Sequence, residues 1–202
     1  MSLERILGNL LFVNVRALQI FLSLATAFFL PAALIHGELS TGTTHSISFV
    51  DLGGNKLSTA DGHITIVVLT TSADREQART VGDHVPDFCL GNPAYRMITV
   101  VHFIHSHMAI GRRMATAFIR HRVGEAAKRL QARYDAQKIS RDAKNDIFVV
   151  TDFDGTIAAQ LGQSAEATDF CVFVFGQTGE LLAQWHGVPG TDELAAAVKK
   201  SD

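Results

Sequence analysis

The chain has 202 residues, a formal net charge of −2 and a hydrophobic content of 47%. This hydrophobic content excludes a disordered chain, and the nearly neutral charge gives no global attraction to nucleic acid or to acidic membranes. The length leaves room for one domain with a hydrophobic core and a short tail.

The N-terminal residues 1–37 are expected to be an export segment. Residues 17–35 contain no charged side chain, and Arg5 and Arg16 precede them. This apolar run is just long enough to span a bilayer as a helix, and its positive flank favours a cytoplasmic N-terminus. A cleaved signal peptide has a similar pattern, so both a membrane anchor and a signal peptide stay open. Both alternatives place the rest of the chain outside the cytoplasm, either membrane-anchored or secreted.

The folded domain is expected to span residues 46–202, after a small and polar linker at residues 38–45. Residues 64–70 form a continuous, largely β-branched run, which is typical of a strand buried on both faces. Ser72 is expected to cap the helix that follows, Pro86 is expected to kink it, and Gly91 with Pro93 is expected to end it.

The second half of the chain alternates between strand and helix patterns. Residues 96–103 predict a buried strand, and residues 112–137 predict a long helix. The long helix is expected to bury an apolar stripe, Met114, Phe118, Val123, Ala127, Leu130 and Tyr134. The later elements are expected to be a strand at 147–151, a helical turn at 156–161, a buried strand at 170–175, an antiparallel strand at 180–186 and a closing helix capped by Thr191.

This order of elements predicts an α/β fold with a mixed central sheet and helices on both faces. It resembles the thioredoxin-like superfamily, in its exported thiol-disulfide and peroxiredoxin-like branch, over about residues 46–200. The similarity is best near the C-terminus. There Asp152 precedes the sequence AAQLG, an apolar strand, a G-x-x-G turn and the dipeptide HG at 186–187.

The redox motif that this resemblance implies is missing. Thioredoxin-type catalysis places C-x-x-C at the start of the helix after the first central strand, where residues 69–78 read LTTSADREQA. The segment before the strand at 170–175 also lacks the proline of the family. The resemblance therefore implies a binding or accessory domain with an unknown protein or small-molecule partner and no cofactor. The candidate binding surface is the loop 71–75 with the facing segment 166–169, and its candidate residues are Thr71, Ser72, Asp74, Arg75, Ala167 and Thr168.

The two cysteines of the chain, Cys89 and Cys171, leave three alternatives open. They are two structural thiols, one disulfide, or a reactive Cys89, and Cys171 in its buried strand is expected to be inert. A reactive Cys89 would make the chain a thiol-dependent peroxidase or reductase. Arg75, Arg96 or His84 would then supply the positive field that stabilises the thiolate.

The motif DFDGT at residues 152–156 follows an apolar run, as in the phosphatases of the haloacid dehalogenase superfamily. In such an enzyme Asp152 would be the nucleophile and Asp154 the general acid. The enzyme would also need a lysine and an acidic pair on later strands, but only a hairpin and a helix are expected after Thr156. A turn formed by Asp and Gly, followed by a helix that Thr156 caps, is the preferred interpretation, and the phosphatase is the alternative.

Three histidines gather near the end of the second strand, at His102, His105 and His107. Two histidines one residue apart on an extended chain point to the same side and could bind a metal. Because no acidic or cysteine ligand is adjacent in the sequence, no metal site is predicted.

Residues 112–144 form a basic region, with ten lysines and arginines against three acidic residues. This face could contact anionic lipid or an acidic partner, and a solvated helix surface is the plain alternative. No nucleic-acid partner is expected for an exported domain that has no aromatic platform among these charges.

Overall fold

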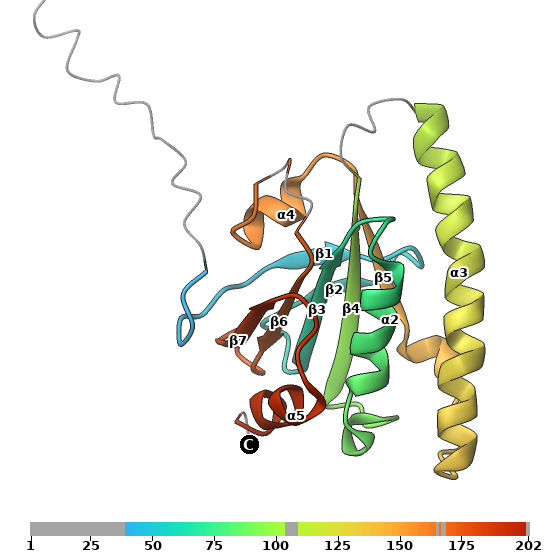
Figure 1. Cartoon of the computed structure of the whole chain (residues 1–202), viewed down its shortest axis with the longest axis vertical. Coiled ribbons are helices and arrows are strands. Elements are labelled where there is room, and N and C mark those ends of the chain that lie inside the picture. Colours follow the sequence, from blue (N-terminus) through green and yellow to red (C-terminus); the bar gives the residue numbers. More distant parts are fainter. Residues whose placement is uncertain (1–38, 104–108, 165, 167–168, 201–202) are drawn as a thin grey trace, which may run out of the picture. The chain divides into compact units, whose positions relative to one another are not determined.

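The computed structural model describes residues 39–103, 109–164, 166 and 169–200, and the expected export segment lies outside them (Figure 1). Their helices and strands are β1 (Ser48–Val50), β2 (Lys56–Ser58), β3 (Ile64–Thr70), α2 (Arg75–His84), η1 (Asp87–Cys89), β4 (Tyr95–His102), α3 (Ala109–Ala136), η2 (Ala143–Asp146), β5 (Phe148–Asp152), α4 (Thr156–Gln160), β6 (Cys171–Phe175), β7 (Leu181–His186) and α5 (Thr191–Lys199).

A five-stranded mixed sheet forms the centre, in the order β5-β4-β3-β6-β7. Strand β3 pairs in parallel with β4 and antiparallel with β6. Strand β5 extends the parallel side, and β7 pairs antiparallel with β6 at the other edge. Every residue of β3 is buried because it has a strand on each side and a covering layer on each face. The expected mixed α/β sheet is confirmed.

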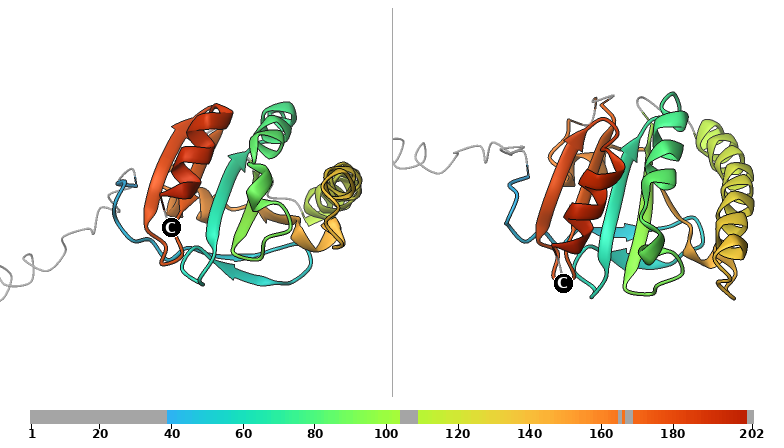
Figure 2. Two further views of the ribbon diagram at one scale, coloured as in Figure 1. Left: turned by 90° about the horizontal axis from the view of Figure 1, so that it is seen from below. Right: turned by 60° about the horizontal axis from the view of Figure 1, so that its bottom comes forward.

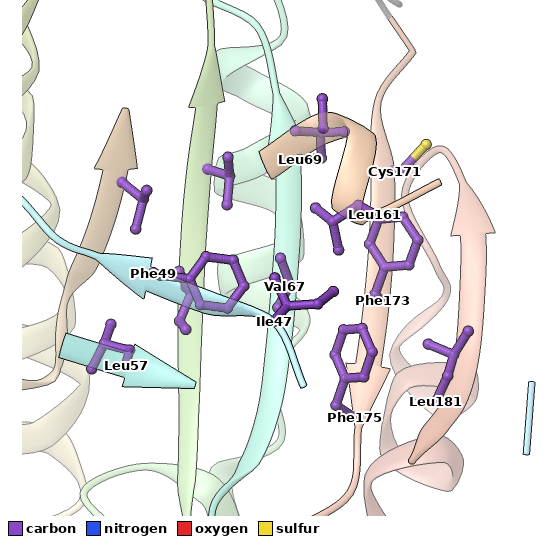
Figure 3. Packing of buried hydrophobic residues seen from close by; sticks show 14 residues of the cluster. Ile47, Phe49, Leu57, Val67, Leu69, Leu161, Cys171, Phe173, Phe175 and Leu181 are labelled. Carbon is purple, nitrogen blue, oxygen red and sulfur yellow. The ribbon is translucent and has the colours of Figure 1, made fainter. Parts of the chain in front are cut away.

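Two separate hydrophobic clusters cover the two faces of this sheet. On one face, Phe49 of β1 and Leu161 after α4 pack with Phe173 of β6 (Figure 3). On the other face, Val81 of α2 and Leu194 of α5 are fully buried against the sheet (Figure 2). The expected cover on both faces is therefore confirmed.

The β1–β2 hairpin was not predicted from the sequence. Its strands have three residues each, which is too short for a period-two pattern to be recognised. Asp51 stabilises the turn, since its Oδ1 atom accepts hydrogen bonds from the backbone N–H groups of Gly53 (2.8 Å) and Asn55 (2.7 Å). Phe49 and Leu57 are buried against one face of the sheet, so the hairpin covers that face.

Two predicted helix caps were wrong by one or two residues. Helix α2 begins at Arg75 with Asp74 as its N-cap residue, and Ser72 lies exposed before it. It ends at His84 and does not continue through a kink at Pro86 to Gly91, because Pro86 begins the separate η1 turn. Helix α5 has Gly190 as its N-cap residue, and its backbone N–H donates to Glu193 Oε2 at 2.8 Å. Residue type favours Ser and Thr as caps, but the path by which the chain enters the helix decides which residue takes the position.

The apolar stripe predicted for α3 is buried only in its C-terminal part. Tyr134 is 2% exposed, whereas Met114 is 70% and Phe118 is 51% exposed. The C-terminal part packs on η2 and on the end of α2, where Arg133 donates to the carbonyl oxygen of Gly82 at 2.9 Å. The prediction of burial for the N-terminal part was therefore wrong, because the helix extends beyond the surface that it covers (Figure 1).

The chain before β1 runs along the β7 edge of the sheet. Gly42 N donates to Leu181 O at 2.8 Å, and Leu181 N donates to Thr43 O at 2.9 Å. Helix α3 lies at the opposite, β5 side in both views (Figures 1 and 2). Among the helices of the described residues, none has the length and apolar character needed to cross a membrane.

Candidate functional site

A shallow pocket of about 470 Å³ lies where β3, α2, β6 and β7 meet. The strand register produces this meeting, because Leu69 near the end of β3 pairs with Cys171 at the start of β6. Cys171 in turn pairs with His186 at the end of β7. The residues that line the pocket are Asp74, Gln77, Asp169, Phe170, His186 and Gly187.

The loop before α2 holds the carboxylate of Asp74 in place. Thr71 Oγ1 donates to Asp74 Oδ2 at 2.6 Å and accepts a hydrogen bond from Ala73 N at 3.2 Å. Gln77 Nε2 donates to Asp74 Oδ1 at 3.4 Å. A carboxylate in this position is favoured by the positive end of the helix dipole. The loop thus presents an ordered acidic group at the start of α2, the position at which thioredoxin-type catalysis would need a cysteine.

The predicted binding residues divide between the pocket and its surroundings. Of the candidate residues that the structure describes, Asp74 lines the pocket, as does Asp169 at the end of the predicted segment 166–169, while Ser72 and Arg75 are exposed nearby. Ala167 and Thr168 lie outside the described residues. Sequence reasoning missed four lining residues, although the dipeptide HG had been noted as a family feature. They are Gln77, Phe170, His186 and Gly187.

Cys171 lies directly behind His186, with its Sγ atom 3.4 Å from Nδ1 of the imidazole. The thiol is 1% exposed. Burial, together with the negative charge of Asp169, raises the pKa of Cys171 to about 11. The thiol therefore keeps its proton at neutral pH, which is the reverse of thiolate activation.

Cys89 is also buried, but on the other face of the sheet. It ends the η1 turn after α2 and packs in the cluster under α2 and α5, whereas Cys171 packs in the cluster under the β1–β2 hairpin. The two cysteines are not joined by a disulfide. The sheet between the two clusters prevents such a bond without rearrangement of the fold.

The groups expected to activate Cys89 make contacts elsewhere. Arg96 donates to Asp61 Oδ1 at 2.7 Å and Oδ2 at 2.8 Å. His84 Nδ1 donates to Pro189 O at 2.8 Å. Arg75 is the first residue of α2 and Cys89 follows its last turn, so a helix of about 15 Å separates them. The geometry gives no support to an activated Cys89.

Asp152 of the DFDGT motif is a helix cap inside the fold. Its carboxylate accepts hydrogen bonds from Ala158 N at 3.0 Å and Ile157 N at 3.3 Å, at the start of α4. The same carboxylate lies 3.1 Å from His102 Nδ1, and both side chains are at most 3% exposed. A buried carboxylate that is already bonded on both oxygens is poorly placed to attack a phosphate ester.

Asp154 stabilises the turn between β5 and α4. Its Oδ1 atom accepts a hydrogen bond from Thr156 N at 3.1 Å, and Gly155 between them has a φ of 74°. The backbone and side chain of Thr156 hold the pKa of Asp154 below its ordinary value. A general acid needs a raised pKa, so this environment opposes the phosphatase alternative and agrees with the predicted turn. The predicted cap was wrong, because Thr156 is the first residue of α4, Gly155 takes the N-cap position, and Asp152 accepts the N-terminal hydrogen bonds.

Within the described part of the chain, no three His, Cys, Asp or Glu side chains are grouped closely enough to hold a metal ion. His102 is buried against Asp152, and His105 and His107 lie outside the described residues.

Comparison with solved structures identifies a thioredoxin-like fold. The pneumococcal exposed lipoprotein thioredoxin from Streptococcus pneumoniae is 14% identical, with 77% of this chain and 98% of that chain covered at a TM-score of 0.50. A thiol:disulfide interchange protein from Chlorobium tepidum is 13% identical over 82% of this chain and 99% of that chain, with a TM-score of 0.48. A peroxiredoxin-like protein from Aquifex aeolicus is 15% identical over 82% of this chain and 90% of that chain, with a TM-score of 0.47. No protein-family model matches the chain, and no curated protein matches it.

Proposed function

We propose that this thioredoxin-like domain is the binding module of an exported protein and carries out no disulfide exchange. The pocket lined by Asp74 and Asp169 would recognise a protein segment or a small ligand. The observation that carries the proposal is the absence of an accessible thiol where β3, α2 and β6 meet among the described residues. Asp74 and Gln77 occupy that position, and the sulfur behind it, Cys171, is buried with a raised pKa.

The lining of the pocket supports a particular ligand chemistry. Asp74 and Asp169 supply carboxylates, and His186 supplies an exposed imidazole. Phe170 supplies apolar surface to the lining, although most of its side chain is buried and only 7% is exposed. A few polar groups beside an apolar wall are typical of small binding sites. The expected ligand therefore carries a cationic or hydrogen-bond-donating group next to an apolar one.

The proposal that the protein is exported depends on the N-terminal segment. Residues 17–35 are uncharged and follow Arg5 and Arg16, a pattern typical of an anchor or a signal peptide. Separation of membrane and soluble fractions, with mass spectrometry of the mature N-terminus, would distinguish the two. An intact N-terminus in a soluble cytoplasmic fraction would contradict export.

A peptide array tests the binding proposal. The full chain, purified in mild detergent, is applied as wild type and as the double variant Asp74→Lys/Asp169→Lys. We expect bound peptides to carry Lys or Arg beside an apolar residue, and the variant to bind them at least about 10-fold more weakly. Cys171→Ser is expected to bind like the wild type, because the sulfur takes no part.

The matched control for this experiment is Asp192→Lys/Glu180→Lys. These two acidic residues are exposed on α5 and at the β6–β7 turn, so the variant has the same change in net charge. If the control weakens binding as much as the pocket variant, the change in net charge causes the loss and the pocket is not the binding site. Unchanged binding by the pocket variant would contradict the proposal.

A further inference from the structure

The N-terminal half of α3 exposes apolar and basic side chains together. Met114 and Phe118 are 70% and 51% exposed. Residues 109–124 contain four arginines and no acidic residue. The arginines are Arg112, Arg113, Arg120 and Arg122.

The helical period places these residues on one outward face. At about 100° per residue, Met114 and Phe118 lie about 40° apart around the helix axis, and Met114 is about 140° from the buried Ile119. Arg113 and Arg120 lie about 100° and about 120° from Met114, on the side away from Phe118, at the border of the exposed half of the helix. On the other side Arg122 extends over the ring of Phe118, with its guanidinium carbon 4.9 Å from the ring centroid. We name these five residues, Arg113, Met114, Phe118, Arg120 and Arg122, the α3 face.

The composition of the α3 face is unfavourable for an isolated domain. Positive charges near the N-terminus of a helix oppose its dipole, and α3 has no acidic residue in its first turn to compensate. Exposed Met and Phe side chains also lose the stabilisation that burial would provide. Arginine, methionine and aromatic residues are the types enriched where proteins bind one another.

We propose that the α3 face docks an acidic segment of a partner protein. Met114 and Phe118 would pack against apolar side chains of that segment, and the arginines would pair with carboxylates around them. Charge complementarity selects an acidic partner, because no acidic residue lies among these arginines. This inference is independent of the pocket at Asp74 and Asp169.

The chemistry of the α3 face favours an acidic protein segment as this partner. The planar guanidinium groups of its arginines can each pair with a carboxylate through two parallel hydrogen bonds. Contact with a lipid bilayer is the alternative outcome that the following experiment distinguishes.

Photo-crosslinking tests this proposal on the full chain in the cells that produce it. p-Benzoylphenylalanine replaces Met114, and the control replaces Val50, which is 60% exposed on β1. We expect a protein adduct at position 114 and none at position 50, with an acidic sequence in the crosslinked peptide. An adduct with lipid, a peptide without acidic residues, equal adducts at both positions or no adduct would overturn the proposal.

Charge reversal supplies the second measurement. Arg113→Glu/Arg120→Glu is expected to abolish the adduct and to weaken binding of the purified partner by about 10- to 100-fold. Lys56→Glu/Lys144→Glu changes the net charge equally at exposed sites elsewhere and is expected to bind as the wild type. Equal losses in both variants would overturn the proposal. Circular dichroism checks that Arg113→Glu/Arg120→Glu folds, which is expected because both side chains are exposed.

Discussion

The Sγ atom of Cys171 lies 3.4 Å from Nδ1 of His186, at the edge of a solvent-accessible pocket, yet this thiol is held in its protonated form. A helix N-terminus can lower the pKa of a thiol, but Cys171 begins a buried strand. Desolvation there raises the pKa of the thiol, and Asp169 adds a negative charge that disfavours the thiolate. The same fold can therefore hold a thiol beside its pocket without making it a nucleophile.

Cys171 should be inert to alkylation in the folded protein. With a pKa of about 11, only about one thiol in ten thousand is ionised at pH 7, and the side chain is 1% exposed. The measurement is the rate of reaction with iodoacetamide against pH, with mass spectrometry to assign each cysteine. In guanidinium chloride the same residue should react with an ordinary thiol pKa of about 8.5. Rapid modification of folded Cys171 at pH 7 would contradict this assignment.

Asp61 should make the domain sensitive to acid. Burial opposes its ionisation, but hydrogen bonds from Arg96 and His63 prevail and lower the pKa of Asp61 to about 2. The unfolded chain binds this proton near pH 4, so between pH 4 and pH 2 it holds more protons than the native state. The free energy of unfolding should therefore fall as the pH falls through that interval.

Urea unfolding at several pH values measures this effect. Asp61→Asn should remove part of the pH dependence, and the control Asp192→Asn, an exposed site on α5, should leave it unchanged. An identical slope in wild type and Asp61→Asn would show that other carboxylates cause the acid sensitivity.

Asp152 and Asp154 should differ strongly in their contribution to stability. Asp152→Ala removes a buried carboxylate that caps α4 and contacts His102, so we expect a loss of about 3 kcal/mol. Asp154→Ala removes one exposed hydrogen bond, from Thr156 N in the turn, and should lower the free energy of unfolding by about 0.5 to 1 kcal/mol. Chemical denaturation of the two variants provides the comparison. Equal stability, combined with magnesium-dependent hydrolysis of phosphate esters by the wild type alone, would instead favour the phosphatase alternative.

Tyr134 should fix the C-terminal half of α3 to the domain. Its hydroxyl donates to Asp146 Oδ2 at 2.8 Å and accepts from Gly91 N at 3.0 Å. Burial and the carboxylate of Asp146 raise the pKa of Tyr134 to about 12, so the hydroxyl stays protonated. Tyr134→Phe should lower the free energy of unfolding by about 1 to 2 kcal/mol, since it leaves these partners unsatisfied. A thermal melt compared with Tyr95→Phe, at a tyrosine that is only partly buried, measures the difference.

The central strands could be predicted because their residues are buried on both faces. Ile64–Thr70 and Cys171–Phe175 are continuous apolar runs, and such runs leave few alternatives to a central strand. The hairpin of β1 and β2 could not be predicted, since Phe49 and Leu57 become a core only when the chain folds back over the sheet. The burial of Met114 was predicted wrongly, because periodicity identifies a helical face but not the length of the surface beneath it.

The candidate site was predicted in part. The loop of residues 71–75 was identified, and Asp74 does line the pocket. Gln77 was missed because it lies one turn into α2, and His186 because it lies more than 100 residues further along the chain. Antiparallel pairing of β6 with both β3 and β7 brings these positions together.

The sequence by itself determined the central strands, the fold class and the absence of a C-x-x-C pair, because these depend on local residue types and their order. Only the tertiary structure decided the chemical state of the side chains. It placed Cys89 and Cys171 on opposite faces of the sheet, and it made Asp152 a buried cap. The physical reason is that pKa values, burial and access depend on contacts between distant segments, and residue type gives no measure of those contacts.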